Sequence, residues 1–87
     1  MTDQIRRSAR SVAANVAEGY RKRRYTNLFV LKMVDADGEC AETQVWLDTA
    51  HDCGYMNSAH HQALLADYEE VGRMLGSMIE HPERFAP

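Results

Sequence analysis

Three stretches of apolar residues recur with the 3.6-residue period of an α-helix, and this periodicity constrains the fold more than any other feature. The first stretch places one face of a helix at Ile5, Ala9, Val12, Val16 and Tyr20. The last stretch keeps the same spacing of four and three residues, at Leu64, Tyr68, Val71, Leu75 and Met78. Both prolines come after residue 80, so none interrupts a helix before that point. The sequence therefore predicts an all-α protein.

Helix start and stop signals predict three helices, at about residues 3–22, 26–53 and 58–80. Gly54 is placed to end the second helix in a left-handed conformation, and Asn57 or Ser58 is placed to cap the third. Short connections make successive helices antiparallel neighbours. We expect one domain over residues 1–87, an antiparallel up-and-down helical bundle, with residues 81–87 forming a loose tail.

The second predicted helix is apolar around much of its circumference. We expect its buried seam to consist of Leu28, Leu31, Val34, Gly38, Ala41, Val45 and Leu47 or Asp48, broadened by Val30, Met33, Cys40 and Trp46. Glycine in the middle of a helix lowers its stability relative to alanine. The presence of Gly38 therefore predicts that another helix crosses closely at this position. The excess of apolar residues indicates that a fourth helix or a neighbouring subunit covers part of this helix.

Charge is distributed very unevenly along the 87 residues, whose net charge is −3. Residues 1–24 hold seven basic and two acidic side chains, whereas the remainder holds three basic and eleven acidic ones. The seven basic residues are Arg6, Arg7, Arg10, Arg21, Lys22, Arg23 and Arg24. Two interpretations remain open: contacts with the acidic helices of another subunit, which we favour, and contacts with the phosphates of a nucleic acid.

Other kinds of site find little support in the sequence. Cys40 and Cys53 lie roughly 20 Å apart on one helix, too far for a disulfide, so we expect reduced thiols. The histidines lack the spacing of zinc ligands, and no motif of a known catalytic class is present. No apolar run reaches the ~20 residues of a membrane span. We expect a cytoplasmic protein that is not an enzyme and has no cofactor, metal, membrane partner or small-molecule substrate.

The stretch from Ser11 to Tyr20, SVAANVAEGY, resembles the signature of the four-helix bundle proteins encoded within 23S rRNA intervening sequences. A second stretch, with Glu42 and Gln44 followed later by Gly54 and Tyr55, is similar to another conserved part of that family. The residues that match the two motifs, for which we expect structural roles, are Ser11, Asn15, Glu18, Gly19, Glu42, Gln44, Gly54 and Tyr55. In particular, we expect Asn15 to hydrogen-bond a loop backbone and Glu18 to pair with a basic neighbour.

This resemblance carries several implications. It implies a four-helix bundle, here lacking its first helix, that forms homo-oligomeric rings, typically pentamers, without established catalytic activity. A similar protein, the accessory variability protein of diversity-generating retroelements, binds a reverse transcriptase and nucleic acid. We therefore expect a self-associating scaffold or accessory subunit. The alternative is a nucleic-acid-binding accessory protein of a reverse transcriptase or of an rRNA-associated element, with RNA or DNA as the partner.

Overall fold

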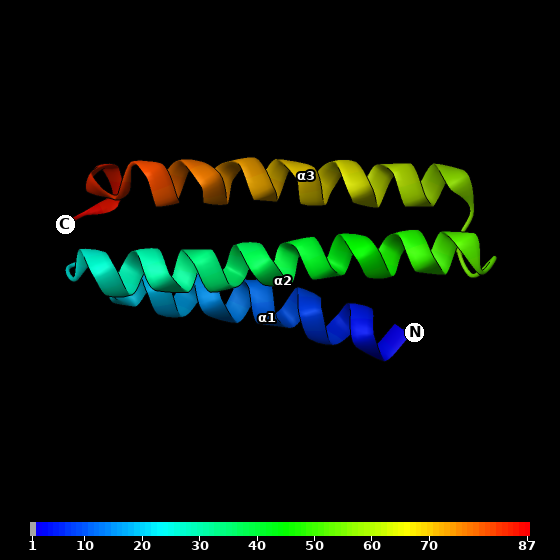
Figure 1. Cartoon of the computed structure of the whole chain (residues 1–87), viewed down its shortest axis with the longest axis horizontal. Coiled ribbons are helices and arrows are strands. Elements are labelled where there is room, and N and C mark those ends of the chain that lie inside the picture. The colour runs from blue at the N-terminus through cyan, green and yellow to red at the C-terminus, as the bar shows by residue number, and fades with distance from the viewer. Residues whose placement is uncertain (1) are drawn as a thin grey trace.

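The computed structural model describes residues 2–87 and contains three long antiparallel helices (Figure 1). They are α1 (Thr2–Arg21), α2 (Thr26–Asp52) and α3 (Ser58–Glu80), followed by the short 3₁₀ helix η1 (Pro82–Phe85). Each boundary lies within one residue of the predicted one, and the prediction of an all-α, up-and-down arrangement is confirmed. The molecule is a rod of 45 × 20 × 13 Å. Within residues 2–87, no helix combines the length and the apolar character that crossing a membrane requires.

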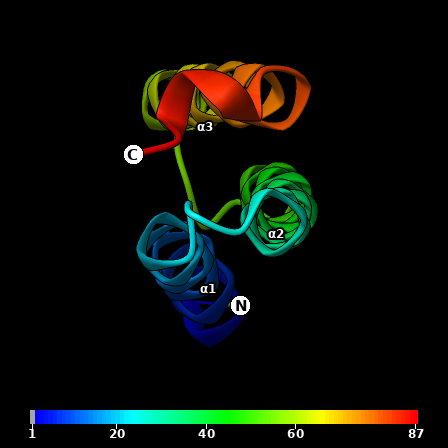
Figure 2. The ribbon, with the colours of Figure 1, turned by 90° about the vertical axis from the view of Figure 1, so that its left-hand side faces the viewer.

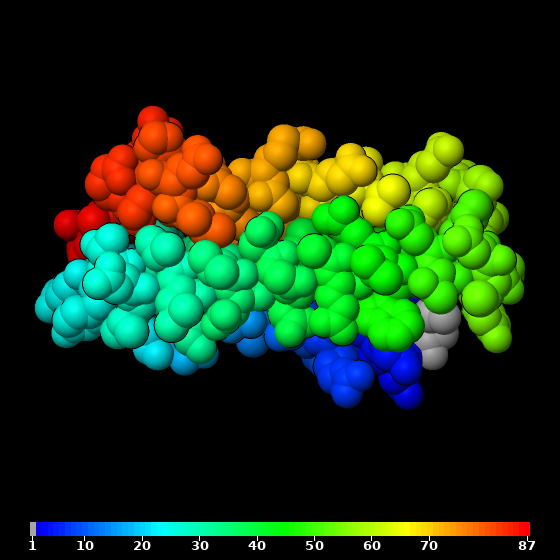
Figure 3. Space-filling view, viewed as in Figure 1, coloured from blue at the N-terminus to red at the C-terminus, as the bar shows by residue number. Residues whose placement is uncertain are grey.

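Helix α2 is the centre of the structure. Helices α1 and α3 each pack along α2, and within the described residues no Cα atom of α1 lies within 8 Å of a Cα atom of α3. The end-on view in Figure 2 shows the three helices at the corners of a triangle. The space-filling view in Figure 3 shows a face on which α2 lies open along most of its length, between α3 and α1.

The buried face of α2 differs from the predicted seam. Phe29, Met33, Ala36, Cys40, Thr43, Leu47 and Ala50 are buried. Leu28, Leu31, Val34 and Val45 are exposed instead, with Leu31 54% and Val45 61% accessible. The prediction of the seam is therefore wrong for most of its members. The reason is that α2 has two apolar faces, and the inner one includes small or polar residues, such as Thr43, that a search for large apolar side chains passes over.

Helices α1 and α2 approach each other closely at Gly19 of α1. A Cβ atom added there would meet the side chain of Met33 and would lie 2.8 Å from the Cβ of Lys32, on α2. Such a distance is too short for two carbon atoms, so only glycine fits without rearrangement. At Gly38, by contrast, an added Cβ would find no atom within 4 Å. The predicted close crossing at Gly38 is wrong, and the crossing lies at Gly19.

A pair of buried hydroxyl groups joins α1 to α2 near the other end of their contact. Thr43 donates a hydrogen bond to Ser8 Oγ at 2.8 Å, and Ser8 donates to the carbonyl oxygen of Ile5 at 3.2 Å. Both residues are buried, and a buried hydroxyl without a partner would destabilise the fold. Small side chains such as these allow the two helix backbones to approach each other closely.

The connection between α2 and α3 follows the predicted signals. Gly54 adopts a left-handed conformation with φ +80°. Its N–H donates to the carbonyl oxygen of His51, and the Tyr55 N–H donates to that of Ala50, which together form a Schellman motif. Asn57 caps α3 by accepting a hydrogen bond from the His60 N–H at 2.8 Å. The predicted roles of Gly54 and Asn57 are confirmed.

The C-terminal residues are more ordered than expected for a loose tail. Residues 82–85 form η1, and the Phe85 ring stacks on the Phe29 ring of α2 with 6.0 Å between centroids. Phe85 is partly buried against the core that Phe29 and Leu75 help to form. A loose tail is expected because Pro82 cannot continue α3. Proline is nevertheless well suited to the first turn of a new helix, and η1 begins at Pro82.

Candidate functional site

The structure does not bring the seven basic residues of the N-terminal third together. Arg6, Arg7 and Arg10 lie in the first half of α1, where they line a pocket with Asp3 and Gln4. The other four lie at the end of α1 and in the turn that leads to α2. At 1.5 Å per residue, about 16 Å of helix separates Arg10 from Arg21. We call the first group the N-terminal arginine cluster.

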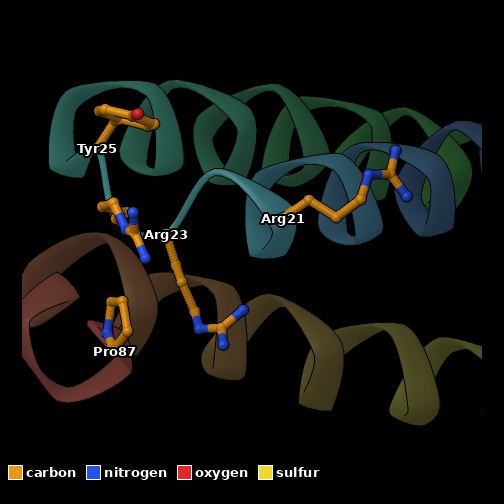
Figure 4. Close-up of a pocket in the computed structure, with 5 residues that line it drawn as sticks. Arg21, Arg23, Tyr25 and Pro87 are labelled. Atoms are coloured by element: carbon orange, nitrogen blue, oxygen red, sulfur yellow. The ribbon is translucent and has the colours of Figure 1, made fainter.

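The second group forms a basic surface at the corner between α1 and α2. Figure 4 shows Tyr25 and Pro87 near the turn, with the Arg21 side chain extending away from them along α1. A pocket of about 260 Å³ lies here, lined by Arg21, Arg23, Arg24, Tyr25 and Pro87. We call this pocket, together with the adjacent Tyr20, the corner surface. It combines three guanidinium groups with two exposed tyrosines.

Hydrogen bonds and ion pairs show which basic groups remain available at this corner. Lys22 pairs with Glu18 at 3.0 Å, so its charge is engaged by a residue of α1. The Arg23 guanidinium lies 4.2 Å from the centroid of the Tyr20 ring and donates to the Tyr20 carbonyl oxygen. Within residues 2–87, no carboxylate forms an ion pair with Arg21, Arg23 or Arg24. The corner surface therefore holds three arginines that no side-chain carboxylate among the described residues pairs with.

Glu18 links the two helices that meet at this corner. Its carboxylate pairs with Lys22, the first residue after α1, and, at 3.5 Å, with Lys32 on α2. The hydrogen bond and charge of Lys22, followed by the charge of Lys32, hold the pKa of Glu18 below its ordinary value. The expected pairing of Glu18 with a basic neighbour is thus present, and it fixes α1 against the start of α2.

The outward face of α2 carries an exposed apolar stripe. Its members recur at spacings of three and four residues: Leu31, Val34, Gly38, Ala41 and Val45. All five are exposed, and we call them the outer stripe. Asp37 and Asp48 follow the stripe on one side, and Asp35 and Glu42 follow it on the other. A narrow seam with this spacing is typical of helices that pack against another helix.

A second apolar region lies in a groove between α1 and α3. Its volume is about 370 Å³. The lining residues are Ala9, Val12 and Ala13 from α1, and Leu64, Asp67, Tyr68 and Val71 from α3. The groove exists because the two outer helices contact α2 and diverge from each other.

Three more of the motif residues on α1 and α2 make local contacts. The Asn15 amide donates to the carbonyl oxygen of Ser11 at 2.9 Å, within its own helix. The expectation that Asn15 bonds a loop backbone is therefore wrong, because its amide donates to the preceding turn of its own helix instead. The Gln44 amide donates to the sulfur of Cys40 at 3.6 Å.

The two remaining motif residues, Glu42 and Tyr55, face solvent. Glu42 accepts a hydrogen bond from the indole N–H of Trp46 at 3.2 Å. Tyr55 contributes its backbone N–H to the α2–α3 connection, while its side chain is exposed. The motif residues are thus dispersed along the rod and do not converge on one pocket.

A stacked pair of histidines at the α2–α3 end is a feature that sequence reasoning missed. The rings of His51 and His61 lie 4.4 Å apart and nearly parallel. His61 contacts Asp48 at 2.7 Å, and His51 contacts Ser58 at 3.0 Å. The spacing of ten residues across the Gly54 turn was the available signal. Within the described part of the chain, no three His, Cys, Asp or Glu side chains are placed to hold a metal ion.

Comparison with known proteins gives one result. A family model described as "23S rRNA-intervening sequence protein" matches residues 1–77. Nothing among the curated proteins or the solved structures matches the chain. The matched residues include all three helices except the last turn of α3, together with every motif residue from Ser11 to Tyr55. The chain therefore belongs to the 23S rRNA-intervening sequence protein family, a family of small helical proteins of unknown function.

Proposed function

We propose that this protein is a non-enzymatic scaffold or accessory subunit that acts by associating with further copies of itself in the cytoplasm. The observation that carries the proposal is the outer stripe of α2. Its apolar residues are turned away from the core, where they gain nothing from the fold of a single chain. Burying them against a second helix removes their apolar area from water, which is the main driving force of association.

The charges beside the stripe favour a particular partner surface. Acidic side chains follow both edges of the outer stripe, whereas the outward face of α1 carries Arg6 and Arg10, with the small Ala17 further along the same face. A second copy that sets its α1 against this stripe pairs opposite charges and places a small residue against the apolar seam. Since the two surfaces differ, the contact is head-to-tail and can close into a ring. The resemblance to the family favours a pentamer.

Light scattering coupled to size exclusion tests the proposal with the double variant Leu31→Lys and Val45→Lys. We expect the wild-type protein to be oligomeric and the variant to be monomeric, with unchanged helical circular dichroism. Met74→Lys is the matched control, because Met74 is 52% exposed but lies on α3, away from the stripe. A monomeric wild-type protein, or equal dissociation by the control, contradicts the proposal.

A second candidate function is nucleic-acid binding. It is supported by the arginines of α1 and of the corner, which have no carboxylate partner within residues 2–87. Such charges bind phosphates by releasing counterions, so affinity must fall steeply as salt rises. Filter binding of RNA at two salt concentrations tests this function. An absence of retention at low salt removes it.

A further inference from the structure

We infer that the corner surface is a binding site for single-stranded nucleic acid, in which Arg21 and Arg24 hold phosphates and Tyr25 stacks on a base. The inference rests on nucleic-acid binding as the second candidate function, and it names the place and the form of the ligand.

The chemistry of the pocket favours an anion of limited size. Arg21, Arg23 and Arg24 line a space of about 260 Å³ together with Tyr25 and Pro87, and among residues 2–87 no side-chain carboxylate forms an ion pair with any of the three. This volume falls below the roughly 300–1,000 Å³ of pockets that enclose a drug-sized molecule. Guanidinium groups are planar donors that match phosphate oxygens in pairs. A phosphodiester group of a nucleic-acid strand that continues past the pocket is small enough for this volume and offers the phosphate oxygens that guanidinium groups bind.

The tyrosines indicate that the bases are contacted as well. Tyr25 is 61% exposed and Tyr20 is 53% exposed. Arg23 already lies over the Tyr20 ring, so Tyr25 is the ring of the pair that such stacking leaves free. Proteins that bind single strands combine a positive surface with aromatic rings on which bases stack. A duplex hides its base faces and cannot use Tyr25 in this way.

The N-terminal arginine cluster provides an internal comparison. It holds as many arginines as the corner pocket, but its pocket is lined by Asp3 and Gln4 and includes no aromatic residue. If only the number of arginines matters, removing two arginines from either cluster weakens binding equally. If the corner is the site, substitutions there weaken binding far more than the same substitutions in the N-terminal cluster.

Fluorescence anisotropy with a labelled oligouridine and a duplex RNA of the same length tests the inference at low salt. We expect Arg21→Ala with Arg24→Ala to weaken oligouridine binding about tenfold or more, and Arg6→Ala with Arg10→Ala to weaken it about twofold to threefold. Tyr25→Ala is expected to cost about tenfold without changing the salt dependence, whereas Tyr25→Phe retains binding. Circular dichroism checks that each variant keeps its helices.

The outcomes separate the site from the function. Equal weakening by the two double variants means that nucleic acid binds without using the corner, which overturns the inference alone. Equal affinity for the duplex, or no effect of Tyr25→Ala, overturns the stacking at Tyr25 and with it the single-strand assignment. No binding by the wild-type protein overturns both the inference and the second candidate function. Dissociation of the oligomer by Arg21→Ala with Arg24→Ala, at unchanged RNA affinity, assigns the corner to a subunit contact and also overturns the inference.

Discussion

The two cysteines occupy opposite environments. Cys40 is 1% exposed, donates a hydrogen bond to the Tyr68 carbonyl oxygen at 3.3 Å, and has a pKa raised by burial. Cys53 is exposed at the end of α2. Because the thiolate is the reactive form, we expect the exposed Cys53 thiol to react rapidly with a maleimide. The buried Cys40 thiol should react only when the chain unfolds. Mass spectrometry over time measures the two rates of modification. The control variant Cys53→Ser should lose the fast phase. Similar rates for both thiols would contradict the prediction.

The contribution of Glu18 to stability should depend on pH. Its pKa is lowered in the folded state by Lys22 and Lys32, so the stabilisation is present above the unfolded-state value of 4.5 and is lost as pH falls through the lower folded value. Thermal melts of Glu18→Gln should therefore show a deficit at pH 7 that disappears in acid. Glu69→Gln, which removes an exposed carboxylate without an ion pair among residues 2–87, is the control and should melt like the wild type.

Some of these residue contacts could be predicted, and others could not. The pairing of Glu18 with Lys22 follows from their spacing of four residues on a helix. The contact of Asn15 with Ser11 has the same spacing, but a loop contact was expected because small polar residues beside an apolar stripe also suit a neighbouring loop. The division of the arginines into two clusters follows from the length of α1, which the sequence predicts.

At the scale of the helices, two glycines should respond oppositely to alanine. Gly19→Ala forces a methyl group against Lys32 and Met33, so we expect it to lower the free energy of unfolding by about 1–3 kcal/mol. The added methyl group of Gly38→Ala meets no atom within 4 Å. This substitution should raise the free energy of unfolding by up to about 1 kcal/mol, because alanine favours the helix. Urea denaturation of both variants measures the difference. A stabilising Gly19→Ala would contradict the close crossing of α1 and α2.

The C-terminal helix η1 should contribute to stability through Phe85. Its ring is partly buried against Phe29, so we expect Phe85→Ala to lower the free energy of unfolding by about 1–2 kcal/mol, below the 3–5 kcal/mol of a fully buried phenylalanine. Arg84→Ala, one residue earlier and exposed, should have almost no effect. Urea denaturation again compares them, and equal stabilities of the two variants would mean that η1 does not support the core.

The boundaries of the helices were predictable because their caps are local. Gly54 and Asn57 act within a few residues of their positions, and the sequence contains all that they need. The inner face of α2 was not predictable in the same way, because it depends on what packs against the helix. Periodicity detects an apolar face but cannot rank two of them, and Thr43 belongs to the inner face because Ser8 of α1 meets it there.

At the scale of the whole molecule, a mixing experiment distinguishes a head-to-tail contact from a symmetric one. A variant with Arg6→Glu and Arg10→Glu loses the α1 surface, and a variant with Leu31→Lys and Val45→Lys loses the outer stripe. Each alone should be monomeric, whereas an equimolar mixture should form dimers, because one intact surface of each kind remains. Sedimentation velocity measures this. Monomers in the mixture, or oligomers of the first variant alone, would rule out the head-to-tail contact.

The separation of the α1 and α3 backbones within the described residues has a consequence for how the chain folds. The molecule is two helical hairpins that share α2, so most close backbone contacts join helices that follow each other in the chain. Chains dominated by such contacts close small loops first and fold quickly, in microseconds to milliseconds. Either hairpin can serve as the first structure to form, and destabilising one should leave the other as the starting point of the folding reaction.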